Sequence, residues 1–143
     1  MKSIPDVDIY VRFCESDAGG HASNTSYFFY FEEARSKFFA SMNYGLNDLK
    51  GQTSFILART ECDFIQQAFP GNMITVKTYL THIGTKSFTL DHEIYNKEMN
   101  TLLAKGRAVI VCFDFKEQSS IKISDELRVT LEQHLQANSP QKV

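Results

Sequence analysis

The sequence has no apolar stretch long enough to cross a lipid bilayer, and it carries almost no net charge. Its 143 residues have a formal charge of −2 at pH 7, so binding to nucleic acid or to a membrane surface has no electrostatic support. Residues 1–6 lack the apolar segment that a secretory leader requires. We therefore expect neither a membrane protein nor a nucleic-acid-binding protein.

Cysteine is scarce as well. The three cysteines, at positions 14, 62 and 112, are odd in number and lack the spacing of metal ligands. Cys62 and Cys112 fall in apolar segments and are typical of small core residues. We therefore expect a cytoplasmic protein that needs no metal ion.

What remains is the composition of an ordinary globular protein, with 43% hydrophobic and 22% charged residues. The chain is long enough to bury a core, and no repeat or domain linker divides it. Residues 1–143 are therefore expected to form a single domain.

Apolar periodicity and turn residues predict one strand, a long helix, four more strands and a short C-terminal helix. The expected strands are 7–13, 54–66, 73–83, 86–95 and 101–115. The long helix should stop near residues 43–45, where Gly45 suits a left-handed C-cap, and Ser124 should cap the last helix. Short turns between consecutive strands require antiparallel pairing. This indicates an α+β domain with a five-stranded antiparallel sheet around an apolar helix. Residues 47–53 should form a polar connection, residues 138–143 a frayed tail, and Gly106 a bulge or a close approach.

The run from Arg12 to Arg35 carries most of the chemical information. It contains Asp17-Ala18-Gly19-Gly20-His21, then Asn24, and from Tyr27 onward apolar positions at helical spacing. The glycine pair permits a positive φ or a close approach to a bound group, and Asn24 is expected to cap the helix. The pattern predicts a carboxylate, an imidazole and the N–H donors of a helix N-terminus in one small region. The free N–H donors and the partial positive charge of the helix N-terminus suit a developing oxyanion.

This run resembles the Asp-x-x-Gly-His-x-x-Asn-x-x-Tyr motif, followed by Phe-Glu-x-Ala-Arg, of hotdog-fold acyl-CoA thioesterases of the 4-hydroxybenzoyl-CoA thioesterase type. The nine matching positions are Asp17, Gly20, His21, Asn24, Tyr27, Phe31, Glu32, Ala34 and Arg35. The resemblance covers nearly the whole chain and implies the hotdog fold, in which the sheet wraps around a long central helix. It also implies a homodimer or homotetramer whose subunits pair their sheets and place the active site at the seam. A long strand such as 101–115 would otherwise leave an exposed edge.

The resemblance assigns the chemistry to Asp17, as a general base that activates water or as a nucleophile that attacks the thioester. An Asp before glycine would by itself indicate only a turn, and the nine matched positions favour catalysis. His21 is expected to orient substrate or water, or to hydrogen-bond the loop backbone. Gly20 and Asn24 belong to the same catalytic turn.

Three further residues are candidates for substrate binding. Tyr27 either lines the acyl pocket or fills the core. Lys86 and Ser87 either contact a CoA phosphate or the pantetheine, or form a solvated hairpin. The helix carboxylates Glu32 and Glu33 are alternative bases, because a related branch of hotdog thioesterases uses a helix glutamate. We favour an intrahelical ion-pair role for both.

The sequence thus predicts an acyl-CoA thioesterase that hydrolyses a small acyl- or aromatic acyl-CoA without a cofactor. An acyl group on an acyl carrier protein is an alternative substrate. Two other functions are considered. One is a hotdog protein that binds acyl thioesters without turnover. The other is an enoyl-thioester hydratase, whose usual Asp-x-Asn-Pro-x-His motif differs from the run between Asp17 and His21.

Overall fold

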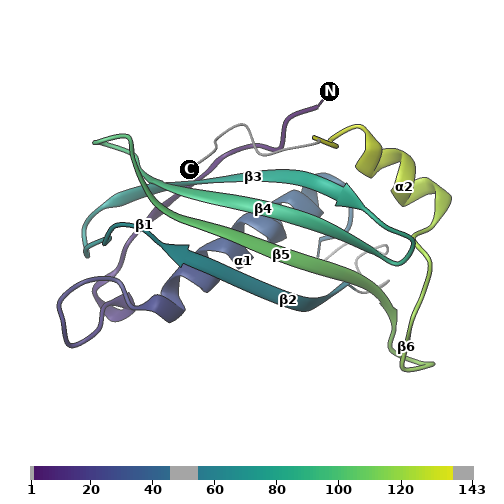
Figure 1. Cartoon of the computed structure of the whole chain (residues 1–143), viewed down its shortest axis with the longest axis horizontal. Helices are drawn as coiled ribbons and strands as arrows, with labels where there is room; N and C mark the ends of the chain where they lie inside the picture. The colour runs from purple at the N-terminus through teal and green to yellow at the C-terminus, as the bar shows by residue number, and fades with distance from the viewer. Residues whose placement is uncertain (1, 46–54, 137–143) are drawn as a thin grey trace.

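In the computed structural model, which describes residues 2–45 and 55–136, five antiparallel strands form a sheet that wraps around one long helix (Figure 1). The elements in chain order are β1 (Val7–Tyr10), the 3₁₀ turn η1 (Phe13–Glu15), α1 (Asn24–Ser41), β2 (Phe55–Phe64), β3 (Met73–Ile83), β4 (Ser87–Asn96), β5 (Thr101–Asp114), β6 (Ser119–Ser120) and α2 (Asp125–Glu132). The sheet order is β1-β3-β4-β5-β2, and the two-residue β6 pairs with the end of β5. The α+β class and the hotdog arrangement are confirmed. The expected connection 47–53 and tail 138–143 lie outside the described residues.

α1 buries the side that faces the sheet. Its buried apolar residues recur at three- and four-residue spacing: Tyr27, Tyr30, Phe31, Ala34 and Phe38. Partners in the same core include Val76 of β3, Ile94 of β4 and Ala104 of β5. Each fully buried large apolar side chain contributes roughly 1.5–3 kcal/mol. Helix–sheet packing is therefore a main source of stability. None of the helices among residues 2–45 and 55–136 is long and apolar enough to cross a membrane.

Gly106 marks a close approach of helix and sheet, one of the two roles expected for it. The ring of Phe31 lies where a side chain at position 106 would have to go. The pairing of Gly106 with Cys62 and His92 is in regular register, so no bulge occurs there.

The first strand and the long helix both end earlier than predicted. The first strand ends at Tyr10, and Phe13 begins η1 with its side chain 85% exposed. The long helix ends at Ser41, and Asn43, not Gly45, takes the left-handed conformation with φ of 69°. Asn adopts this conformation more readily than most residues with a Cβ, so it replaces the expected glycine.

A register shift between Leu57 and Arg59 changes the direction of the side chains along β2. Before the shift, odd-numbered Phe55 packs against the core, and after it even-numbered Cys62 does so. Simple alternation over 54–66 predicts that Ile56 and Cys62 share one face and that Phe55 lies on the other. The register shift makes this prediction wrong for β2.

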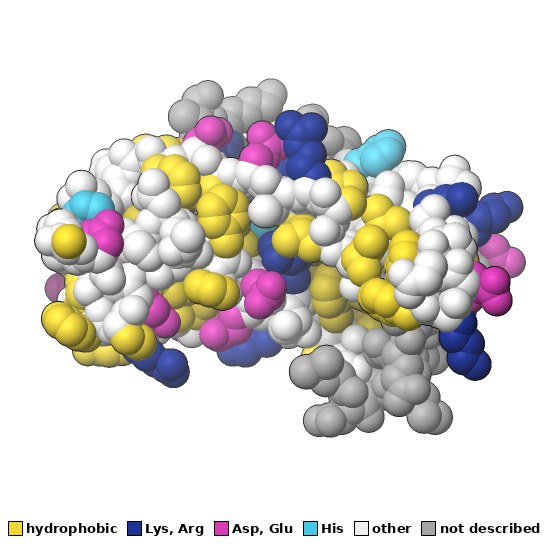
Figure 2. Space-filling model, turned by 90° about the horizontal axis from the view of Figure 1, so that it is seen from below, with side chains coloured by type: hydrophobic (Ala, Val, Ile, Leu, Met, Phe, Trp, Pro, Cys, Tyr) yellow, Lys and Arg dark blue, Asp and Glu magenta, His cyan; other side chains and the backbone are white. Residues whose placement is uncertain are grey.

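Within the described ranges 2–45 and 55–136, β2 is the outermost strand on its side of the sheet and pairs only with β5. The expectation that strand 101–115 leaves an open edge is wrong, because β5 lies between β4 and β2. Figure 2 shows the molecule from below, the side on which β2 lies in Figure 1. Hydrophobic side chains gather there in several patches between acidic and basic ones. Leu57 and Phe64, both in β2, are each 43% exposed.

Candidate active site

Residues 16–22, which we call the Asp17 loop, are closed by their own backbone. Ser16 and Ala22 form an isolated antiparallel bridge, and the Asp17 N–H donates to the His21 carbonyl (3.0 Å). The Gly20 N–H donates to the Asp17 carbonyl (3.0 Å), with Gly20 at φ of +81°, a conformation that a residue with a Cβ rarely adopts. The Gly19 N–H donates to Asp17 Oδ1 (2.8 Å). The loop thus holds one carboxylate oxygen and leaves Oδ2 on the side of His21.

Asp17 and His21 lie next to each other in this loop, and both reach solvent. Asp17 Oδ2 is 3.7 Å from His21 Nδ1, and the two side chains are 40% and 28% exposed. His21 Nδ1 is also 3.2 Å from the Ala22 carbonyl oxygen, so backbone holds the ring as well. A carboxylate with one accessible oxygen is able to accept a proton from water or to attack an electrophilic carbon.

The N-terminus of α1 follows the loop directly and is open. Ser23 takes the N-cap position, and its hydroxyl lies 3.0 Å from the hydroxyls of Thr25 and Ser26 without bonding a helix N–H. The prediction that Asn24 caps the helix is wrong, because Asn24 is the first helical residue. No described residue accepts a hydrogen bond from the N–H of Asn24 or Thr25. Two donors at the positive end of the helix dipole are therefore available to a ligand.

Tyr27 supports the loop from the core. It is 3% exposed; its hydroxyl accepts from the Ala68 N–H (3.1 Å) and donates to the Gln66 carbonyl (3.3 Å). The Ala68 carbonyl in turn accepts from the Ala22 N–H (2.7 Å). Burial raises the pKa of Tyr27, so the phenol stays neutral. Of the two roles considered, core packing is present in this structure.

Lys86 and Ser87 lie far from the Asp17 loop within one chain. The turn between β3 and β4 is at the right end of the sheet in Figure 1, whereas the chain enters α1 at the left end. Lys86 Nζ is 3.4 Å from Ser120 Oγ, and the Lys86 carbonyl accepts from the Cys112 N–H (2.9 Å). The single chain therefore does not bring these two residues to Asp17.

The two helix carboxylates, Glu32 and Glu33, each lie beside a cationic side chain of α1. Glu33 Oε2 forms the expected ion pair with Lys37 Nζ at 3.3 Å. Glu32 lies near Arg35 and lines with it a cavity of about 180 Å³ between α1 and β2. Burial lowers the pKa of Arg35, and the Glu32 charge opposes that shift.

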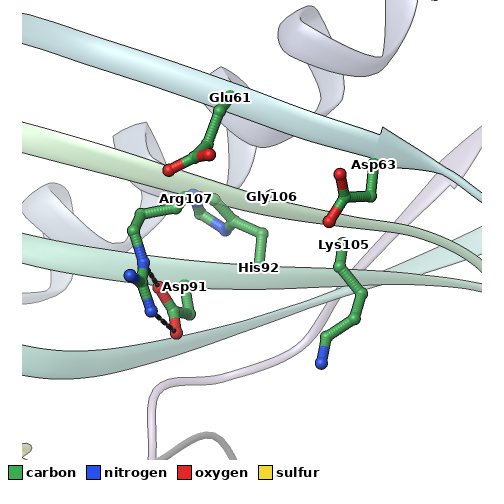
Figure 3. A pocket seen from close by; sticks show the side chains of 7 residues that line it. All are labelled: Glu61, Asp63, Asp91, His92, Lys105, Gly106 and Arg107. Carbon is green, nitrogen blue, oxygen red and sulfur yellow. Dashed lines mark hydrogen bonds and ion pairs between the residues drawn. The ribbon is translucent and has the colours of Figure 1, made fainter. Parts of the chain in front are cut away.

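A polar cavity of about 310 Å³ lies elsewhere, on the sheet (Figure 3). Its lining residues are Glu61, Asp63, Asp91, His92, Lys105, Gly106 and Arg107. Gly106 of β5 faces α1, and it pairs with Cys62 of β2 and His92 of β4. Side chains alternate along a strand, so the charged residues at the odd-numbered positions beside these three project from the opposite face of the sheet. Arg107 binds Asp91 through two hydrogen bonds of 2.7 and 3.1 Å.

The sequence suggested no role for Glu61 or Asp63, although period-two alternation in β2 and β5 places these charges together. No group of three or more His, Cys, Asp or Glu in the described part of the chain is arranged to hold a metal ion.

Sequence reasoning also missed Glu15 and Tyr30. The Tyr30 hydroxyl donates to Glu15 Oε1 (3.1 Å) across fifteen residues of chain. Neither residue belongs to the nine matched positions, and no local pattern marks a contact of this length.

Comparisons with known proteins identify the family of this chain. YsmA of Bacillus subtilis (strain 168), described as uncharacterized, is 30% identical over 123 residues, which are 86% of this chain and 82% of YsmA. The acyl-CoA thioester hydrolase YbgC of Escherichia coli O157:H7 is 25% identical over 107 residues, 74% of this chain and 79% of YbgC. The structure of a "predicted thioesterase" from Bacillus stearothermophilus matches with a TM-score of 0.83 and 31% identity, over 94% of this chain and 98% of the other. The profile of the Thioesterase-like superfamily matches residues 11–131, and the chain belongs to this superfamily.

Proposed function

We propose that the protein is an acyl-CoA thioester hydrolase and that Asp17 carries the chemistry. The observation that supports this most is the placement of the Asp17 carboxylate, whose side chain is partly exposed, in a loop that leads directly into the open N-terminus of α1. The relative YbgC, named as an acyl-CoA thioester hydrolase, makes the same activity the first to test. A more specific assignment to the 4-hydroxybenzoyl-CoA type rests on the motif alone.

Two routes are compatible with these groups. As a general base, Asp17 takes a proton from water, and the resulting hydroxide adds to the thioester carbonyl carbon. As a nucleophile, Asp17 adds to the same carbon and forms a mixed anhydride, which water then hydrolyses. In both routes the carbonyl oxygen becomes negative and accepts hydrogen bonds from the free N–H groups of Asn24 and Thr25. When this tetrahedral intermediate collapses, the C–S bond breaks, and the thiolate of CoA leaves and takes up a proton. In the second route this collapse is the step that forms the mixed anhydride, before water attacks it.

The substrate we propose is a small acyl- or aromatic acyl-CoA, with an acyl carrier protein as an alternative thiol carrier. Lys86 and Ser87 are proposed to contact the phosphates or the pantetheine. His21 orients water or the thioester, and Gly20 gives the loop its turn. Neither hydrolysis route requires a redox cofactor. We place the activity in the cytoplasm because all three cysteines are free thiols.

We also propose a homodimer, or a homotetramer built from it, in which two copies of β2 pair. A ten-residue edge with exposed apolar side chains is a template for strand pairing. Antiparallel pairing about a two-fold axis would place the Asp17 end of one sheet beside the Lys86 end of the other. In such a dimer, Asp17 of one subunit would lie near Lys86 of the other, although the two residues are far apart within one chain.

The test of the function is release of free thiol from short, medium, long and aromatic acyl-CoAs, together with identification of the acyl product. Equal amounts of free acid and CoA would support the proposal. Binding of acyl-CoA without thiol release would instead identify a non-catalytic binding protein. A hydrated acyl chain still attached to CoA, formed from an enoyl-CoA, would identify a hydratase.

A further inference from the structure

Glu15, the last residue of η1, connects the chain before the Asp17 loop with the helix after it. Its carbonyl accepts from the Ser23 N–H (2.9 Å) and the Ser26 hydroxyl (2.8 Å). Its carboxylate oxygen Oε1 accepts from the Arg12 N–H (2.8 Å) and the Tyr30 hydroxyl (3.1 Å). Glu15 therefore bonds to residues on both sides of the Asp17 loop, Arg12 before it and Ser23 after it, and to the first two turns of α1.

Tyr30, the hydrogen-bond donor to Glu15, is held in place by the core. Its side chain is 3% exposed, and its ring packs edge-on against Tyr27 with the centroids 6.1 Å apart. Burial, and then the negative charge of Glu15, raise the pKa of Tyr30, so its hydroxyl keeps its proton. A hydrogen bond from a buried hydroxyl to a carboxylate is stronger than one between two neutral groups.

The hydrogen bond between Glu15 and Tyr30 affects the distance between the Asp17 carboxylate and the free N–H donors at the start of α1. Asp17 follows Glu15 by two residues, whereas the free N–H of Asn24 belongs to the helix that carries Tyr30. A displacement of Glu15 from Tyr30 changes the position of the carboxylate relative to the oxyanion donors. Misplacement by 1 Å is enough to slow a reaction by about 10²-fold.

We propose that Glu15 and Tyr30 are positioning residues, which hold the Asp17 loop in register with the open N-terminus of α1. This inference rests on the proposed thioesterase function. Turnover through Asp17 requires the intact pair, whereas binding of CoA does not involve it. Losing the pair therefore lowers kcat and leaves KM almost unchanged.

The experiment measures kcat and KM for thiol release by Tyr30→Phe, Glu15→Ala, Glu15→Gln and the double variant Glu15→Ala/Tyr30→Phe. The first two should lower kcat by about tenfold or more, with KM within about twofold of wild type. The double variant should be no slower than Glu15→Ala, because both changes remove the same hydrogen bond. Glu15→Gln keeps an acceptor oxygen for Arg12 N–H and for Tyr30, so its kcat should stay within about threefold of wild type.

A matched control is Tyr79→Phe, which removes the same hydroxyl from a tyrosine beside Glu93 in the sheet. It should leave kcat unchanged. The second readout is hydrogen exchange at the amides of Asp17 and Gly20, whose bonds close the loop. Exchange should be faster in Tyr30→Phe and Glu15→Ala and unaltered in Tyr79→Phe.

Wild-type kcat together with wild-type exchange in Tyr30→Phe and Glu15→Ala would overturn the inference. So would a lower melting temperature that leaves both readouts unchanged, because the pair would then serve stability alone. If the wild-type protein releases no thiol from any acyl thioester, the proposed function fails. The exchange measurement still decides whether the pair holds the loop.

Discussion

A Cβ atom on residue 106 would lie 2.5 Å from Cε2 of Phe31. Because Gly106 has no side chain, the Phe31 ring of α1 fits against β5 at this position. That ring is fully buried and stacks on the imidazole of His92 with the centroids 4.9 Å apart. The glycine thus allows α1 to approach the sheet closely. Because the open end of α1 is part of the proposed active site, the same contact helps to set where its N–H donors lie.

The first prediction concerns this contact. Gly106→Ala should lower the free energy of unfolding by about 1–3 kcal/mol, because the added methyl group overfills the core. The measurement is urea denaturation. Phe31→Leu should also destabilise the protein on its own, by leaving a cavity. In the double variant the smaller side chain gives the methyl group space, so the combined loss should be smaller than the sum. Additive losses would contradict the steric explanation.

The second prediction is a pH dependence of stability caused by His92. Its Nε2 is 3.5 Å from Arg35 Nη1 and its Nδ1 is 3.0 Å from Thr78 Oγ1. Burial, and then the charge of Arg35, lower the pKa of His92 to about 3. In the unfolded chain the pKa is about 6.5, so the unfolded state takes up this proton first as the pH falls. The stabilising contribution is therefore complete above pH 6.5 and is lost from there toward pH 3.

The slope from this one group should be at most about 1.4 kcal/mol per pH unit. Urea denaturation at pH 7, 6 and 5 measures it. The raised pKa of Glu93 makes a contribution of opposite sign, which the wild type and the His92→Gln control share. His92→Gln keeps a donor and an acceptor but does not titrate, so its stability should change less with pH. An equal slope in both proteins would remove His92 as the cause.

Sequence reasoning predicted the fold class because its signals are local and periodic. Alternation marks the long strands, and a glycine pair after Asp17 marks a turn in which Gly20 does take positive φ. It failed where two residues compete for one position. Asn43 and not Gly45 ends the helix geometry, and Ser23 and not Asn24 is the N-cap. Asparagine and serine are both accepted at the positions in question, so residue type alone does not choose between them and their neighbours.

Long-range contacts were out of reach of the same reasoning. The shift between Leu57 and Arg59 arises from pairing with β5, and nothing in the residues of β2 alone requires it. The bond between Glu15 and Tyr30 likewise depends on how η1 docks on α1. The register shift affects the β2 edge, and the bond between Glu15 and Tyr30 affects the Asp17 loop. The proposed function depends on both regions.

The third prediction tests pairing through β2. We expect wild-type protein to sediment at micromolar concentration as a multiple of the 16.3 kDa chain. Leu57→Lys replaces an exposed apolar side chain of the β2 edge with a charge that the seam would have to bury. It should weaken the dimer by at least about tenfold, since burying a leucine contributes roughly 1.5–3 kcal/mol. Val129→Lys, on an exposed position of α2 that is 59% accessible, is the matched control and should not alter the mass. A monomeric wild-type protein would rule out the assembly.

The fourth prediction concerns Lys86. An exposed contact between one lysine and one phosphate contributes about 1 kcal/mol or less. Lys86→Ala should therefore raise KM for acyl-CoA by about fivefold at most and leave kcat nearly intact. An acyl-pantetheine without the nucleotide serves as the control substrate, and on it the variant should equal wild type. A large fall in kcat with unchanged KM would exclude a role in holding phosphate.

The fifth prediction is that Asp17→Asn folds, binds acyl-CoA and is nearly inactive. The amide keeps the oxygen that accepts from the Gly19 N–H, so the loop should survive. It takes up no proton from water and is a poor nucleophile, so both routes are blocked. Removal of a general base lowers the rate by about 10²–10⁴-fold, and loss of a covalent nucleophile lowers it further. The measurements are kcat, the affinity for acyl-CoA and the melting temperature.

Glu32→Gln and Glu33→Gln are the controls for this assignment, because they remove a carboxylate from the helix that begins at the same site. Glu33 has its charge paired with Lys37, and Glu32 lies against the buried Arg35, so both changes should lower kcat much less than Asp17→Asn. The comparison depends on equal folding, which the melting temperatures establish. If Asp17→Asn retains more than about a tenth of wild-type kcat, the loss is below the usual effect of a general base. The chemistry would then belong to another carboxylate, and whichever helix variant shows the larger loss would identify it.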